Sequence, residues 1–153
     1  MGSLTFTGNG VLAGNAGRQR MLRRPGAPTY EVIIDEAAVQ RLSAPPDVFK
    51  KQLYHLASVC NNRESAVTLL VLPIDAQIDS FTVPRCTFSI YTYPDPGDPA
   101  VVAIDTVTSD LILTEPGDVA PYDELYTRLR DAALPPQDSL TLLTKAAAEL
   151  PDQ

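Results

Sequence analysis

Few residues in this chain could carry acid–base chemistry, and most of them are carboxylates. Asp35 and Glu36 directly follow an apolar run that ends at Ile34. Open α/β sheets bind ligands at the carboxyl ends of their strands, so one of these two acids could face a cleft there. The simpler interpretation is that they cap a short helix over residues 37–42 or pair with an arginine.

His55 is the only histidine in the sequence. A serine or cysteine nucleophile needs a base of this kind within hydrogen-bond reach. His55 lies in a predicted helix between Leu53 and Leu56, beside the apolar stripe. It could point into a cleft there, although an exposed ring is the commoner arrangement. The sequence therefore lends no support to serine hydrolase or cysteine protease chemistry.

Asp105 interrupts an otherwise apolar run in a predicted strand, and two strand registers are open for it. If Tyr93 lies opposite Ala100, then Asp105 lies opposite Phe88 and away from the tyrosines. A slip of one residue places Asp105 on the face of Tyr91 and Tyr93. That second register would combine a carboxylate with two phenols in a pocket capable of proton transfer, whereas a solvated outer face is the simpler outcome.

The cysteine and aspartate spacings predict no metal site. Cys60 and Cys86 lie far apart and there is one histidine, which excludes zinc sites built on paired Cys or His, and we expect both thiols to be reduced and buried. Asp75 and Asp79 lack the glycine and the further oxygen ligands of a calcium loop. No phosphate-binding glycine pattern follows a predicted strand, so we expect no cofactor.

The charge balance bears on the partners of this chain. The net charge is −7 and the pI is about 4.5, so we expect no nucleic-acid binding by this chain alone. A small basic cluster near the N-terminus could bind a partner, or phosphate, or the acidic body of its own domain; it consists of Arg18, Arg20, Arg23 and Arg24.

The length of 153 residues favours a single domain. Residues 1–26 hold six of the eight glycines and form a glycine-rich basic segment, which leaves residues 27–153 as one α/β domain. No run approaches about 18 apolar residues, and the N-terminus lacks a basic leader. We therefore expect a cytoplasmic protein that does not bind membranes.

Hydrophobic periodicity predicts the order of the elements. The run 29–35 indicates a buried strand, a helix opens at Pro45 and Pro46, and 66–73 indicates a second buried strand. These three form a βαβ unit with parallel strands. An antiparallel meander follows, and then two helices, the first capped by Asp118 and the second after Pro135 and Pro136. The fold class is therefore α/β with α+β character.

The order of several segments is itself recognisable. The segments are RQRML (18–22), EVIIDEAAVQR (31–41), KQLYHLASV (51–59), VTLLVLP (67–73), FSIYTYPDPGDPAVVAIDT (88–106) and VAPYDELYTRLRDAAL (119–134). Together they resemble the C-terminal domain of unknown function of actinobacterial antitoxin-like (Scr-type) transcriptional regulators, without the helix-turn-helix that precedes it there. The resemblance implies a regulatory role in binding a protein or an effector, and it transfers no catalytic motif.

Two functional hypotheses follow. The first is a sensory or protein-interaction module that binds a small partner protein or a small-molecule effector, and that could form a homodimer through a sheet edge or its last helix. The alternative is a cofactor-free cyclase or isomerase of specialised metabolism with acid–base residues in an apolar cleft, namely Asp35, Glu36, His55, Tyr91, Tyr93 and Asp105. Placement of these six on separate solvated faces would remove the basis of the enzyme hypothesis.

Overall fold

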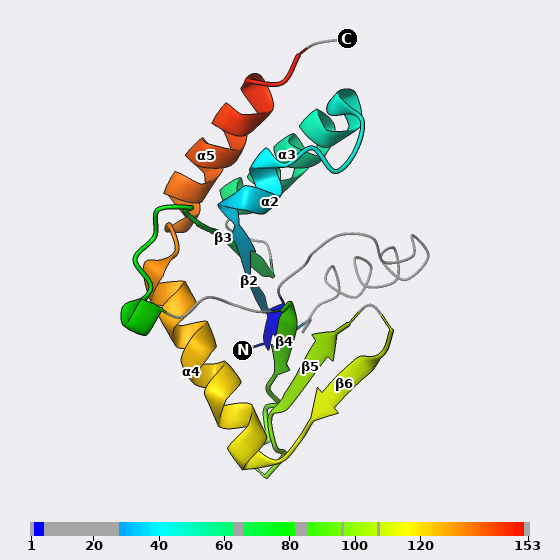
Figure 1. Cartoon of the computed structure of the whole chain (residues 1–153), viewed down its shortest axis with the longest axis vertical. Helices are drawn as coiled ribbons and strands as arrows, with labels where there is room; N and C mark the ends of the chain where they lie inside the picture. Colours follow the sequence, from blue (N-terminus) through cyan, green and yellow to red (C-terminus); the bar gives the residue numbers. More distant parts are fainter. Residues whose placement is uncertain are drawn as a thin grey trace.

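A computed structural model describes residues 2–4, 28–62, 66–81, 86–95, 97–106 and 108–151. Within them, one sheet has the strand order β3-β2-β1-β4-β5-β6 (Figure 1). Its strands are β1 (Gly2–Leu4), β2 (Tyr30–Asp35), β3 (Val67–Leu72), β4 (Phe88–Tyr91), β5 (Val101–Asp105) and β6 (Asp110–Leu113). β1 pairs parallel with β2 and antiparallel with β4. It therefore joins a parallel half of the sheet to an antiparallel half.

The predicted βαβ unit is confirmed. β2 and β3 pair in parallel along their whole length, from Tyr30 opposite Val67 to Asp35 opposite Leu72. Between them lie α2 (Glu36–Gln40) and α3 (Pro46–Asn61). Proline suits the first turn of α3 because its missing N–H would have no partner inside the helix. α3 buries Phe49, Leu53 and Ala57, which recur every four residues and so lie on one face.

The antiparallel meander and the two C-terminal helices are confirmed as well. β4, β5 and β6 pair in sequence order, and α4 (Pro116–Ala132) and α5 (Pro136–Ala148) follow. A short 3-10 turn, η1 (Asp79–Phe81), precedes β4. The prediction that Asp118 caps α4 is wrong, because α4 begins at Pro116 and Glu115 occupies the cap position. Asp118 lies in the first turn, where a negative charge still favours the helix dipole.

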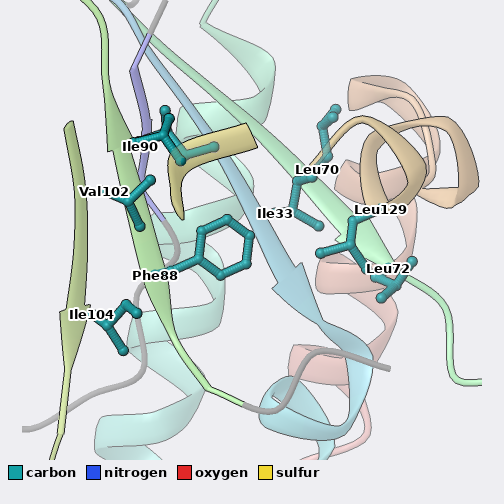
Figure 2. Packing of buried hydrophobic residues seen from close by; sticks show 9 residues of the cluster. Ile33, Leu70, Leu72, Phe88, Ile90, Val102, Ile104 and Leu129 are labelled. Atoms are coloured by element: carbon teal, nitrogen blue, oxygen red, sulfur yellow. The ribbon is translucent and has the colours of Figure 1, made fainter. Parts of the chain in front are cut away.

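The sheet is covered differently on its two faces. α4 contacts both β3 and β5, so it spans both halves of one face; Figure 2 shows Phe88 of β4 lying with Ile33 of β2 and Leu129 of α4 in that core. On the other face, α3 and α5 pack on each other and on β3. In Figure 1 these two helices lie at the end of the molecule away from β6.

Both cysteines are free, but they differ in exposure. Cys60 is half-buried and Cys86 is exposed. The expectation that both thiols are buried is therefore wrong for Cys86. This residue lies two positions before β4, whose buried part begins at Phe88.

Among the helices of the described residues, none has the length and apolar character needed to cross a membrane.

Candidate interaction surface

The two acids after β2 have structural roles. Asp35 is the N-cap of α2, and its carboxylate accepts a hydrogen bond of 2.8 Å from the backbone N–H of Ala37. Glu36 accepts one hydrogen bond from the Gln40 amide at 2.6 Å and another from the backbone N–H of Ile74 at 2.8 Å. Glu36 thus ties α2 to the loop after β3, and these contacts employ both of its carboxylate oxygens.

The other candidate residues lie on other elements. His55 is exposed on α3, and Tyr91 and Tyr93 are exposed at the end of β4. Tyr91 lies opposite Val101, four residues from Asp105 along β5, which corresponds to about 13 Å at the rise of a strand. The structure therefore distributes the six residues of the enzyme hypothesis over α2, α3 and two separate parts of the antiparallel half.

The observed register decides the environment of Asp105. Phe88 lies opposite Ile104, so the register is the one that places Asp105 on the face of Tyr91. Directly opposite Asp105 on β6 is Asp110. The neighbouring pair is hydrogen-bonded, since Thr106 N donates to the carbonyl of Ser109 at 3.1 Å. Because bonded and non-bonded pairs alternate in an antiparallel ladder, the two aspartates form a non-bonded pair, whose side chains lie closest.

This cross-strand pair of aspartates is unfavourable for the isolated chain. Like charges directly opposite each other destabilise a sheet. Both side chains are exposed, and no lysine or arginine among the described residues forms an ion pair with either of them. A cation brought by another molecule would relieve their repulsion.

The antiparallel half carries negative charge only. Between Cys86 and Thr127 the sequence contains no lysine, arginine or histidine. The same stretch contains eight acidic residues, namely Asp95, Asp98, Asp105, Asp110, Glu115, Asp118, Asp123 and Glu124. This stretch supplies β4, β5, β6 and most of α4, which lie in the lower part of the view in Figure 1.

Large apolar side chains are exposed on the same half. Leu111 and Ile112 of β6 are 49% and 56% exposed. Ile112 lies opposite Ala103 and thus on the face of Asp105 and Tyr91, whereas Leu111 lies opposite Ile104 on the face that α4 covers. We define the acidic edge surface as Asp105 of β5 with Asp110, Leu111 and Ile112 of β6. The sequence signal for it is the run DLILT at residues 110–114, in which three apolar residues follow Asp110 without polar alternation.

The two edge strands of the sheet, β3 and β6, differ in whether their outward backbone groups have hydrogen-bond partners in the described chain. At β3, Val71 N–H donates to the buried Ser139 hydroxyl at 2.9 Å, and the Val71 carbonyl accepts from Leu134 N–H at 2.8 Å. The chain thereby closes this edge with its own polar groups. At the other end of the strand order, no described strand pairs with the outer side of β6. An open edge with exposed apolar side chains is a template for a further strand.

A polar contact that the sequence analysis missed joins α4 to β2. The Glu31 carboxylate, with a side chain only 15% exposed, accepts hydrogen bonds from the Tyr126 hydroxyl and from Arg130 Nε, the latter at 2.7 Å. Tyr126 and Arg130 lie four residues apart and so share one helix face. A charged residue inside the strand YEVIID was the available signal. Glu31 borders an open hollow of about 360 Å³ next to the α4–α5 connection.

A second open hollow, of about 380 Å³, lies between α2 and α5 and is bordered by Glu36 and Lys145. Across the described residues, no three His, Cys, Asp or Glu side chains cluster as metal ligands would.

Burial raises the pKa of the Tyr122 phenol, and the charges of Cys86 and Asp118 raise it further. Tyr122 packs edge-on against Phe88 with ring centroids 5.2 Å apart, which is a core contact.

Comparison with known families places the chain. No curated protein and no solved structure matches it. One family profile matches residues 10–145, which is most of the chain and includes β2 to β6, α2 to α4 and most of α5. The chain therefore belongs to the family described as Domain of unknown function (DUF5753).

Proposed function

We propose that this chain is a non-catalytic protein-interaction module that binds a basic segment of a partner protein at the acidic edge surface. The observation that carries the proposal is the aspartate pair Asp105–Asp110, which lies beside exposed Ile112 on an open strand. A cationic side chain of the partner would offset the repulsion of the pair, and apolar side chains would cover Ile112 and Leu111.

The side-chain contacts of this surface contribute modest energies. Full burial of a leucine or isoleucine contributes about 1.5–3 kcal/mol, so covering two side chains that are about half exposed contributes roughly 2 kcal/mol in total. An exposed ion pair adds about 0.2–1 kcal/mol. The acidic half also attracts basic partners before contact, which raises the association rate and makes it depend on salt.

The enzyme alternative has less support. An apolar cleft that gathered several of its six residues would have favoured it. Two of them, Asp35 and Glu36, are engaged in backbone and side-chain contacts at α2. His55 lies on α3, whereas Asp105 is the last residue of β5 in the antiparallel half of the sheet. Acid–base cooperation among these residues is therefore not favoured.

The resemblance to the C-terminal domain of actinobacterial antitoxin-like regulators supplies a biological setting for the proposal. In that setting the contact is regulatory and takes place in the cytoplasm, and the partner is a small basic protein. The arginine cluster at residues 18–24 lies outside the described residues, and its role as a second contact remains a prediction.

Affinity capture with matched variants tests the proposal. The tagged full chain, Ile112→Ser, Asp105→Asn/Asp110→Asn and the control Ile74→Ser are incubated with cytosol of the source organism, and captured proteins are quantified by mass spectrometry. Ile74 is a suitable control because it is also an exposed isoleucine, 69% exposed, but lies in the loop after β3. We expect a basic protein that the wild type and Ile74→Ser retain and the other two lose. Equal capture by all four proteins would contradict the proposal.

A further inference from the structure

The backbone of β6 offers a defined set of free hydrogen-bonding groups. Thr106 and Ser109 form a bonded pair, so the alternation of the ladder makes Ile104–Leu111 the next bonded pair and turns Leu111 toward β5. Asp110 and Ile112 then direct their N–H and C=O groups outward, where no described strand follows β6. These two residues are spaced as one antiparallel partner strand requires.

We infer that the partner segment binds as an added antiparallel strand on the outer edge of β6, and that it carries two apolar residues followed by a lysine or arginine. This inference rests on the proposed function and specifies its mode. Strand addition supplies main-chain hydrogen bonds for affinity, and the alternating side chains supply specificity. The antiparallel direction continues the pairing of β4, β5 and β6 and is the more stable per residue.

The order of partner residues follows from the side chains of β6. Residues that lie opposite each other in a sheet share a face. An apolar residue therefore meets Ile112, a second one meets Leu111 on the other face, and a basic residue meets Asp110 beside Asp105. Because an antiparallel partner runs from Ile112 toward Asp110, its sequence reads apolar, apolar, basic.

Charge complementarity favours a basic partner over a second copy of this chain. In a two-fold antiparallel pairing of β6 with itself centred on Leu111, Ile112 of each copy would meet Asp110 of the other, and the aspartate pairs would gain no cation. Each copy also has a net charge of −7. A basic segment instead neutralises the aspartate pair and keeps its apolar residues against Leu111 and Ile112.

Two blocked, fluorescein-labelled ten-residue peptides test the mode. Both have the same threonine frame, one with the core Val-Ile-Arg and the other with Arg-Ile-Val, so that composition and charge are identical. In anisotropy titrations of the full chain we expect the first to bind about tenfold more tightly. Asp110→Asn should weaken that binding by about fivefold at low salt, the upper range for an exposed ion pair. The amides of Asp110 and Ile112 should gain hydrogen-exchange protection.

A pair of variants separates the backbone of Ile112 from its side chain. Ile112→Ala and Ile112→Pro both remove apolar atoms, but only proline removes the outward N–H, and proline is tolerated on the solvent side of an edge strand. We expect alanine to weaken peptide binding about fivefold and proline to weaken it roughly tenfold more.

Equal binding of the two peptides by the wild type, without amide protection, would overturn strand addition and still be consistent with binding of basic segments to the acidic edge surface. Binding of neither peptide would also overturn strand addition, and the capture experiment would then decide the proposed function independently. Because the comparison of the two peptides uses the wild-type chain, it does not depend on the folding of any variant.

Discussion

Ser139 holds the outer edge of β3 closed, and this role leads to a quantitative prediction. The residue has no exposed surface. Its hydroxyl accepts from Val71 N–H at 2.9 Å and donates to the Leu134 carbonyl at 3.0 Å. Ser139→Ala removes both bonds at once. It leaves the N–H of Val71, a fully buried residue, without its acceptor.

The expected cost follows from the two lost partners. Leaving a buried polar group without a hydrogen bond costs about 1–3 kcal/mol, so we expect Ser139→Ala to lower the free energy of unfolding by about 2 kcal/mol. For a domain of this size that corresponds to a decrease in Tm of roughly 4–8 °C. Urea unfolding followed by circular dichroism measures the first quantity, and hydrogen exchange of the Val71 amide should accelerate.

Ser58→Ala provides the matched control. Ser58 is also a helical serine whose hydroxyl donates to a backbone carbonyl, that of His55 at 2.6 Å, but it is exposed. We expect its effect to stay within about 0.5 kcal/mol, as for most surface substitutions. If Ser139→Ala unfolds at the same urea concentration as the control, water satisfies the Val71 N–H, and the closure of this edge does not depend on Ser139.

Three further predictions concern the α4–β2 contact and the thiols. Glu31→Ala removes the acceptor of Tyr126 and Arg130, and we expect it to lower the free energy of unfolding in urea by about 2 kcal/mol. Arg130→Ala should lower it less, because the Arg130 side chain is 51% exposed. A larger loss for Arg130→Ala would contradict this prediction. Iodoacetamide at pH 8 should label exposed Cys86 well before Cys60, because burial raises the pKa of the Cys60 thiol above its ordinary 9.0. Since the folded state then holds this proton more tightly than the unfolded state, Cys60 contributes stability below pH 9 that is lost as the pH rises further, a loss that Cys60→Ser should remove. Equal labelling rates for the two thiols would refute the burial argument.

Local patterns in the sequence were sufficient for most of the elements, though not for β1, and for the class of the fold. The apolar runs at 29–35 and 66–73 predicted the parallel pair, since strands covered on both faces lack alternation. Prolines before α3 and α5 marked the starts of these helices because proline fits the first turn. The start of α4 was misplaced because Asp118 is itself a good cap residue, although Pro116 begins the helix two residues earlier.

The candidate site depended on contacts that no local pattern specifies. Both registers of β4 and β5 agreed with the period-two pattern. The observed one places Asp105 on the face of Tyr91, but four residues along β5 from Val101, the partner of Tyr91. The pairing of β5 with β6 then brings Asp110 opposite Asp105. Whether an edge is open is likewise a tertiary property: β3 was closed by Leu134 and Ser139, which lie more than 60 residues further along the chain. The sequence by itself determined every described strand except β1, and that residues 86–127 carry only negative charge. Only the packing of distant segments decided that β6 is left at the edge, because strand order and register are set by long-range pairing and burial.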